Sequence, residues 1–319
     1  MSSISGVIKA GNQAVSINEP TGVDIHLTSH GSSWLWAAFS LFGFFVLFHL
    51  TAPLWQKKKI LHFAPLLATL ALFYTYFALA SDLGWTGIQA EFNNDKVSDS
   101  SETPGKRQIF YARYIGWFLA WPSLLFTFES VSHTSPIQID LSFLGNFFTQ
   151  ILLSEIFILA LLIGALIKST YKWGYFVFAV TAAFACIGII CHRQIMITDA
   201  PARTIFLTLF SGVVWIGYLV SWGLCEGGNV IQPDSEAVFY GILDVVLFGF
   251  IPLVHTVLVK KDDEDVSLVL PTNIVEKEVL PKDLSYHSSV HSGRTVGENT
   301  PQDATSPVTE TPVSEPISV

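Results

Sequence analysis

Residues 111–122 have the sequence YARYIGWFLAWP, in which Arg113, Trp117 and Trp121 follow one another at four-residue steps. Side chains at this spacing share one face of an α-helix. A charged side chain in an apolar segment is costly in lipid, so a helix that carries one turns it towards the inside of a bundle. Two later segments have a face of the same kind, namely WIGYLVSW at 215–222 and YGILDVVLF at 240–248. Together these segments predict three helices whose aromatic faces point inward.

The composition of the whole chain indicates a membrane protein. Of its 319 residues 50% are hydrophobic and only 13% are charged, whereas soluble domains carry about a quarter charged residues. A helix needs about 20 apolar residues to cross a bilayer. Such runs are present at 32–54, 60–82, 108–130, 142–167, 172–194, 203–225 and 235–259. The predicted fold is therefore an all-α membrane protein, a seven-helix up-and-down bundle over residues 32–260.

The segments outside the helices differ in character. Residues 1–31 are predicted to form an extracellular N-terminal segment, and the connection 83–107 a small hairpin or an ordered loop. Residues 261–319 are acidic and rich in Ser, Thr and Pro, which predicts a disordered cytoplasmic tail. Three of its residues precede proline and are candidate phosphorylation sites, namely Thr300, Ser306 and Thr311. The Lys57–Lys59 cluster favours an outside N-terminus, although Lys and Arg are almost evenly divided between the two sides.

Ionisable residues inside the predicted membrane segments mark either a function or an internal partnership. Those that stand out are Arg113, Glu155 and Asp244. Arg113 and Asp244 lie on inward faces, so we expect them to pair, which lowers the cost of burying either charge. For Glu155 we expect a hydrogen bond to a neighbouring helix. Spacing alone leaves open a purely structural alternative, an aromatic seam between helices with one buried salt bridge.

Motifs on the third, sixth and seventh segments resemble those of the microbial (type 1) rhodopsin superfamily. They are RYxxW at 113–117, followed by Pro122, WxxYxxxW at 215–222 and LDV at 243–245. The resemblance covers about residues 30–260 and implies the seven-helix fold, with tryptophans that enclose retinal. The corresponding pocket here would be lined by Trp117, Trp121, Trp215, Tyr218, Trp222 and Phe248.

The resemblance also implies roles for the charged residues. Arg113 and Asp244 would be the remnant of the counterion cluster beneath the retinal Schiff base. Glu226 and Glu236, near the outer ends of the sixth and seventh helices, resemble the carboxylates that release protons in this superfamily.

Several positions depart from the family pattern. Phe248 stands where a photoactive opsin has the lysine that forms the Schiff base, and no lysine occurs between Lys172 and Lys260. Without a primary amine no Schiff base forms. The family's proton acceptor, proton donor and pocket proline are replaced by Gly116, Thr127 and Leu219. We therefore expect no covalently bound retinal, no other cofactor and no light-driven pumping. Phe248 would fill part of the vacated space, because an empty apolar cavity costs stability.

Within the superfamily, the chain resembles the fungal opsin-related group that includes the heat-shock-inducible plasma-membrane proteins of yeasts. The shared segments are EPTGVDIHLTSHGSSWLW at 19–36 and SDLGW at 81–85. The resemblance implies a multi-pass plasma-membrane protein associated with stress, with a chaperone-like or regulatory role towards other membrane proteins. Two alternatives stay open. One is a proton or small-acid transporter that uses Arg113, Glu155 and Asp244, and the other is a sensor that binds a hydrophobic ligand noncovalently in the former retinal pocket.

Other functional classes find no support in the sequence. The chain has no recognisable catalytic arrangement of nucleophile and base, no phosphate-binding loop and no metal-ligand spacing. No basic patch stands apart from the loops that flank the apolar segments, so nucleic acid is not an expected partner. We expect a non-enzyme whose partners are the lipid bilayer and other plasma-membrane proteins. No motif selects an oligomeric state, so a homo-oligomer stays open.

Overall fold

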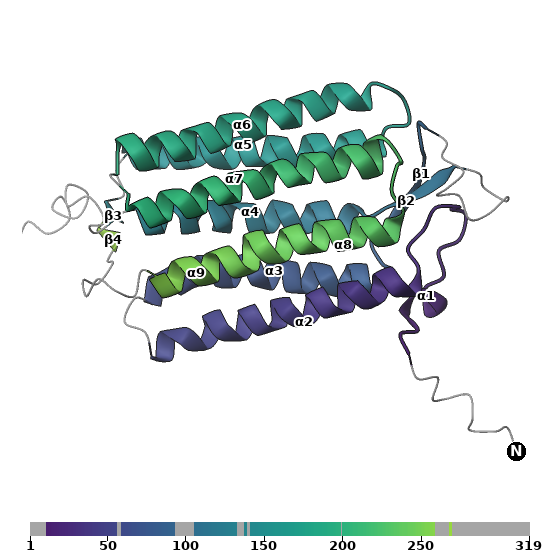
Figure 1. The fold of residues 1–319 in the computed structure, drawn as a ribbon, viewed down its shortest axis with the longest axis horizontal. Coiled ribbons are helices and arrows are strands. Elements are labelled where there is room, and N and C mark those ends of the chain that lie inside the picture. The colour runs from purple at the N-terminus through teal and green to yellow at the C-terminus, as the bar shows by residue number, and fades with distance from the viewer. Residues whose placement is uncertain are drawn as a thin grey trace, which may run out of the picture. The chain divides into compact units, whose positions relative to one another are not determined.

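A computed structural model describes residues 11–55, 59–92, 105–132, 137–138, 141–198, 200–258 and 268–269. In this part of the chain, long helices run side by side, each antiparallel to its neighbour in the sequence (Figure 1). The first six are α2 (Ser29–Thr51), α3 (Phe63–Ala80), α4 (Tyr111–Ser132), α5 (Leu141–Leu166), α6 (Lys172–Met196) and α7 (Ala202–Trp222). The seventh consists of α8 (Pro233–Asp244), a π-helical segment (Val245–Phe250) and α9 (Ile251–Leu258). The predicted seven-helix bundle is confirmed.

The helices close into a ring. Each of them packs against its neighbour in the sequence, and α8 packs against α2, so the seventh helix returns to the first. By length and composition, six helices of the described part can cross a membrane. The helix that is not among them, α4, carries Arg113 and Glu129, and both side chains are buried. The polar residues of α4 therefore face the interior of the bundle rather than lipid.

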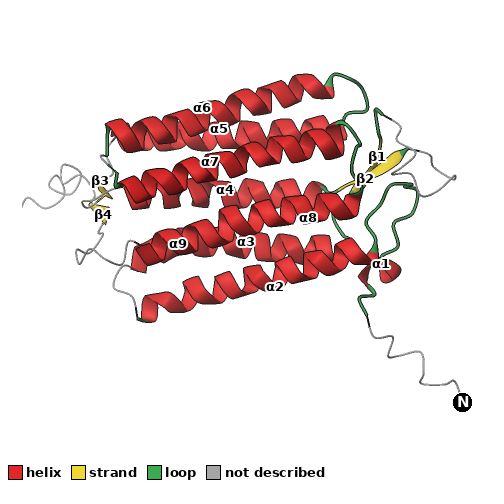
Figure 2. Ribbon diagram, viewed as in Figure 1, coloured by secondary structure: helices red, strands yellow, loops and turns green. Residues whose placement is uncertain are grey.

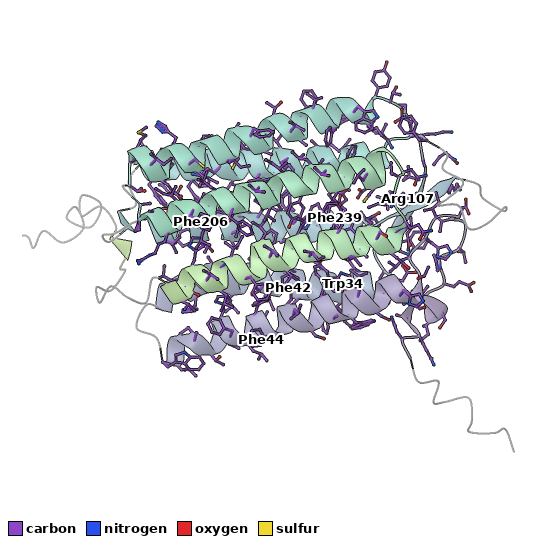
Figure 3. The ribbon with its side chains drawn as sticks, in the orientation of Figure 1. Trp34, Phe42, Phe44, Arg107, Phe206 and Phe239 are labelled. Carbon is purple, nitrogen blue, oxygen red and sulfur yellow. The ribbon has the colours of Figure 1, made fainter. Side chains whose placement is uncertain are left out.

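Aromatic residues are sorted by the face of the helix on which they lie. Phe42 is fully buried, whereas Phe44 on the same helix and Phe206 on α7 are 56% and 68% exposed (Figure 3). In water such exposure would be unfavourable, but lipid tails are as apolar as these side chains. The outward phenylalanines are thus the lipid-facing surface, and the inward ones form the core.

Short structures lie at the ends of the bundle (Figure 2). The strands β1 (Thr86–Gln89) and β2 (Lys106–Ile109) pair antiparallel, with Thr86 opposite Ile109, which confirms the hairpin between the second and third helices. Ile25 forms a β-bridge to Arg107, so the segment before α2 joins this hairpin. The end of the bundle that carries β1 and β2 is called the hairpin end below, and the opposite end the far end. The short helix α1 (Ala14–Ile17) precedes α2.

Most predicted helix boundaries shift by one to three residues, and the tail also differs from its prediction. The first helix begins at Ser29 rather than 32, because the backbone N–H of His30 donates a hydrogen bond (3.2 Å) to the Thr28 hydroxyl, which caps the helix. Within the segment 261–319, which was predicted to be disordered throughout, β4 (Leu268–Val269) pairs parallel with β3 (Ile137–Gln138). The candidate phosphorylation sites Thr300, Ser306 and Thr311 lie outside the described residues, as do Lys57 and Lys58.

Candidate functional site

Asp244 lies at the end of α8, fully buried in the middle of the bundle. Its carboxylate accepts three hydrogen bonds from uncharged donors: the Tyr76 hydroxyl (2.6 Å), the Trp117 indole N–H (2.9 Å) and the Tyr218 hydroxyl (2.6 Å). These donors come from α3, α4 and α7, so one carboxylate connects four helices. Hydrogen bonds of this kind offset part of the cost of removing the group from water.

Arg113 does not pair with Asp244, so that prediction is wrong. Its guanidinium contacts Glu236 at 2.6 Å and Glu226 at 3.5 Å, and it lies 4.3 Å from the ring centre of Tyr240. Glu236 precedes Asp244 by eight residues on the same helix, which places it about 12 Å nearer the hairpin end. Arg113 lies at the level of Glu236 because it belongs to the first turn of α4, which also begins at that end.

The carboxylates of Glu226 and Glu236 belong to a larger buried cluster, the Arg/Glu network, made up of Arg107, Arg113, Tyr114, Glu226, Glu236 and Tyr240. Glu236 accepts from Arg107 at 2.6 Å and from Arg113 at 2.6 Å. Glu226 accepts from the hydroxyls of Tyr114 (2.9 Å) and Tyr240 (3.0 Å). Two guanidinium groups thus face two carboxyl groups in a region closed to solvent.

Arg107 is the member of this network that the sequence analysis missed. It projects from β2 and also donates to Asn229 Oδ1 (2.7 Å) and to the carbonyl of Ile231 (2.8 Å), and it is labelled in Figure 3. Burial is the largest influence on the pKa of Arg107 and alone would lower it, but Glu236, Cys225 and Glu226 together outweigh burial and hold the pKa above its ordinary value. Its position next to an apolar run suggested only a loop cation, because no local pattern reveals that a strand folds back over the bundle.

Cys225, Glu226 and Glu236 place possible metal ligands within 4.8 Å of one another. A cation at this point would face Arg107 and Arg113, which already neutralise Glu236. The charge balance therefore fits an internal ion-pair cluster and does not fit a metal centre.

The positions of the former retinal pocket hold a packed aromatic cluster. Trp121 lies 4.9 Å from Trp215 and 5.1 Å from Phe248, measured between ring centres, and Phe157 contacts both tryptophans. Tyr218 packs on Trp117 at 5.1 Å. All of these side chains are buried. Phe248 thus packs directly against Trp121 from across the bundle.

Trp222 lies apart from that cluster, nearer the hairpin end. It stacks on Phe176 at 5.1 Å with an angle of 17° between the rings, and its indole N–H donates to the carbonyl of Leu161 (3.0 Å). The structure therefore brings together five of the six predicted pocket residues and places Trp222 between α5 and α6.

Gly116 stands at the position of the missing proton acceptor, and the side chain of Thr75 occupies the space that a larger side chain would need there. A Cβ atom at Gly116 would overlap the side chain of Thr75 on α3. A carboxylate side chain cannot occupy this position unless Thr75 moves. The close contact between α3 and α4 therefore accommodates glycine here and excludes the acceptor.

Glu155 joins neither the Arg/Glu network nor Asp244. Its side chain is half-buried on α5, and in the described part of the chain its buried Oε2 has no hydrogen-bond partner. The predicted hydrogen bond to a neighbouring helix is therefore not found for this oxygen, because Glu155 lies at the edge of the inward face rather than on it.

A second buried ion pair at the far end was not predicted. Arg193 on α6 donates to both carboxylate oxygens of Glu129 on α4 (3.1 Å each), and Gln150 on α5 donates to Glu129 at 2.7 Å. Both charged residues fall within the predicted apolar runs 108–130 and 172–194, so their position inside those runs was the available signal. The pair connects three helices at the end opposite to the Arg/Glu network.

Comparison with known proteins agrees with this architecture. The chain is 43% identical to the 30 kDa heat shock protein of Saccharomyces cerevisiae over 263 residues, which are 79% of this chain and 79% of that protein. It is 38% identical to the opsin-like protein carO of Fusarium fujikuroi over 235 residues, 70% of this chain and 71% of that protein.

Solved structures show the same fold. The light-driven proton pump LR (Mac) from Leptosphaeria maculans superimposes with a TM-score of 0.63 at 22% identity, over 74% of this chain and 98% of that chain. A family profile described as "Bacteriorhodopsin-like protein" matches residues 27–258, which include all seven helices. The chain is thus a multi-pass membrane protein, and it belongs to the bacteriorhodopsin-like family.

Proposed function

We propose that this protein works without retinal and without photochemistry, as a stress-associated protein of the fungal plasma membrane. The observation that carries the proposal is the contact between Phe248 and Trp121, because a phenylalanine occupies the position of the retinal lysine and packs on a neighbouring aromatic ring. A phenyl ring offers no amine for a Schiff base. The relative from Saccharomyces cerevisiae that is named a heat shock protein supports the association with stress.

In cells, the protein would assist or regulate other membrane proteins when the membrane is stressed. Its lipid-facing surface is broad and apolar, which suits lateral contacts within the bilayer. We place the hairpin end outside the cell and the C-terminal segment in the cytoplasm, on the basis of the Lys57–Lys59 cluster after the first helix. Reaction of a single introduced surface cysteine with an impermeant thiol reagent on intact cells tests this orientation.

The absence of photochemistry is tested with all-trans retinal. Purified native protein is expected to give no red-shifted absorption band. Because Trp121 also occupies the pocket, a lysine at position 248 needs space beside it, so the informative variant is Phe248→Lys combined with Trp121→Leu. That double variant is expected to give a band that hydroxylamine removes, and Trp121→Leu alone is the control. A hydroxylamine-sensitive band from the native protein would overturn the proposal.

The protective role is tested in cells that lack the protein. After heat stress, such cells are expected to lose plasma-membrane proteins that cells with the native chain retain. Asp244→Asn should restore this retention as well as the native chain does, since a chaperone-like role uses the outer surface and not the buried carboxylate. Equal loss with and without the native chain would contradict the role.

A transport function is the second candidate, and the buried Asp244 favours it, because this carboxylate is bonded only to uncharged donors in the described part of the chain. Proton flux into proteoliposomes that Asp244→Asn abolishes would support transport. Absence of flux from the native protein would remove this candidate.

A further inference from the structure

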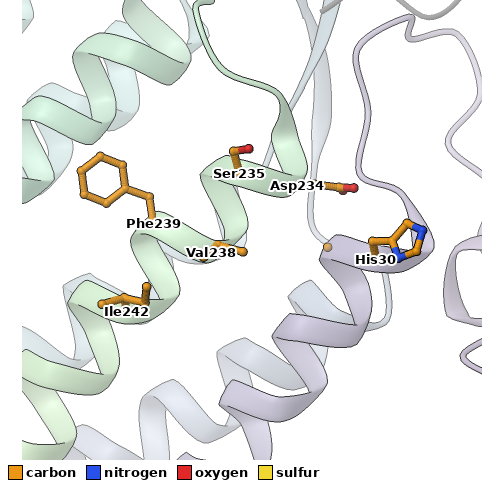
Figure 4. Close-up of a pocket in the computed structure, with 7 residues that line it drawn as sticks. His30, Asp234, Ser235, Val238, Phe239 and Ile242 are labelled. Atoms are coloured by element: carbon orange, nitrogen blue, oxygen red, sulfur yellow. The ribbon is translucent and has the colours of Figure 1, made fainter.

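A groove opens on the lipid-facing side of the bundle between the start of α2 and α8, at the hairpin end (Figure 4). It has a volume of about 470 Å³. Its lining includes His30 from α2 and, from α8, Asp234, Ser235, Val238, Phe239 and Ile242. None of these residues belongs to the Arg/Glu network or to the aromatic cluster.

The groove is polar at one end and apolar along the rest of its length. His30 lies in the first turn of α2, and Asp234 and Ser235 lie in the first turn of α8. Val238 and Ile242 follow one and two turns further along α8, which carries them about 6 to 12 Å deeper along the helix (Figure 4). A ligand that fits this gradient has a small polar head and an apolar body.

The carboxylate at the polar end is held in place. Asp234 accepts from the backbone N–H of Thr28 (2.8 Å) and from the hydroxyl of the same residue. Gly31 permits this approach, since a Cβ atom at that position would overlap the Asp234 carboxylate. A fixed negative charge repels a head group of net negative charge, such as that of phosphatidylserine, while it readily accepts a hydrogen bond from a hydroxyl group.

The two helices that border the groove are joined directly. The indole N–H of Trp34 on α2 donates to the carbonyl of Ala237 on α8 (3.1 Å), and the same ring packs against Gly241. An apolar surface on two joined helices favours a ligand that is itself rigid, because a flexible acyl chain loses more conformational freedom on binding.

We propose that this groove binds a membrane sterol. The sterol hydroxyl donates to Asp234 and lies beside His30 and Ser235, and the fused rings pack on Val238, Phe239 and Ile242. The sterol is chosen over a phospholipid because it combines an uncharged hydroxyl head with a rigid body. This binding site is separate from the proposed stress function and does not depend on it.

The test uses a photoreactive sterol in phosphatidylcholine nanodiscs that contain the purified full chain, with the labelled peptides found by mass spectrometry. Labelling is expected on the peptides of α8 and of the start of α2. Val238→Trp fills the groove and should reduce this labelling about tenfold, which corresponds to about 1.4 kcal/mol of binding free energy. The matched control is Val220→Trp at the hairpin end of α7, where Val220 is also exposed to lipid.

Both substitutions lie on the lipid-facing surface, so both variants should melt at the temperature of the native chain, which verifies that folding is unchanged. The proposal is overturned if Val238→Trp and Val220→Trp are labelled alike. It is also overturned if photoreactive phosphatidylcholine labels the same peptides and unlabelled sterol does not compete. In the Asp234→Asn variant, photoreactive phosphatidylserine should label the same peptides, because the negative charge that repels its head group is gone. Absence of this labelling would contradict the selection of the ligand by charge.

Discussion

At the scale of single residues, Asp244 is a buried carboxylate in a bundle whose seventh helix has no lysine. The carboxylate remains buried without a cation bonded to it in the described part of the chain, and Tyr76, Trp117 and Tyr218 supply its hydrogen bonds. Each donor is itself buried, so the cost of removing one includes a polar atom left without a partner. The group therefore has a structural role even if it has no catalytic one.

Tyr218→Phe is expected to lower the free energy of unfolding by about 1 to 3 kcal/mol, because Asp244 then loses one of its three donors. In the Asp244→Asn background the same substitution should cost less, since the bond no longer involves a charged acceptor. Denaturant unfolding of the purified protein in detergent measures both. Tyr74→Phe on α3 is the control. Tyr74 is exposed, so this substitution should leave the free energy of unfolding unchanged. Equal costs for Tyr218→Phe in both backgrounds would argue against this account.

Asp82, in the turn after α3, makes stability depend on pH. Burial raises the pKa of its carboxyl group from 3.8 to about 6, although the hydrogen bond from Gln108 opposes this shift. Between these two values the folded chain keeps a proton that the unfolded chain releases, so stability is greatest at the acidic end and falls as the pH rises from about 4 to 6.

Asp82→Asn is expected to remove this pH dependence. The backbone at Asp82 has φ of 57°, which asparagine tolerates well. Melting temperatures of the native chain and the variant across this pH window provide the measurement. Parallel curves for the two proteins would exclude Asp82 as the source.

At the scale of elements, the contact between α3 and α4 depends on a glycine. Gly116→Ala should lower the free energy of unfolding by about 1 to 3 kcal/mol, because the added methyl group overlaps Thr75. Thr75→Ala should recover much of this loss in the double variant. Gly188→Ala on α6 is the matched control, since nothing lies within 4 Å of a Cβ atom there. If Gly116→Ala left the free energy of unfolding unchanged, the two helices would be able to adjust their spacing freely.

At the scale of the whole molecule, Arg107 joins the β1–β2 hairpin to the seventh helix through Glu236. Arg107→Ala is expected to lower the free energy of unfolding by about 3 to 5 kcal/mol, as breaking a buried ion pair does. It should also speed amide hydrogen exchange in the hairpin. The exposed neighbour Lys106→Ala is the control and should change neither property. Unchanged exchange in the hairpin would show that its backbone pairing alone holds it in place.

The seven helices and the loss of the retinal lysine could be predicted from the sequence, because both depend on local patterns. Apolar runs long enough to cross a bilayer identify the helices. The four-residue spacing of Arg113, Trp117 and Trp121 identifies an inward face, and the structure buries all three side chains. The sequence itself shows that position 248 holds phenylalanine and not lysine. None of these conclusions requires knowledge of how one helix is shifted along another.

The pairing of buried charges was decided by tertiary structure. Arg113 contacts Glu236 instead of Asp244 because the axial position of α4 relative to α8 determines which carboxylate lies at the level of the guanidinium. Arg107 enters the same cluster only because a strand folds over the end of the bundle, and Glu129 meets Arg193 only because α4 and α6 end at the same level. Helical periodicity specifies the face on which a side chain lies, but not the height of its partner on another helix.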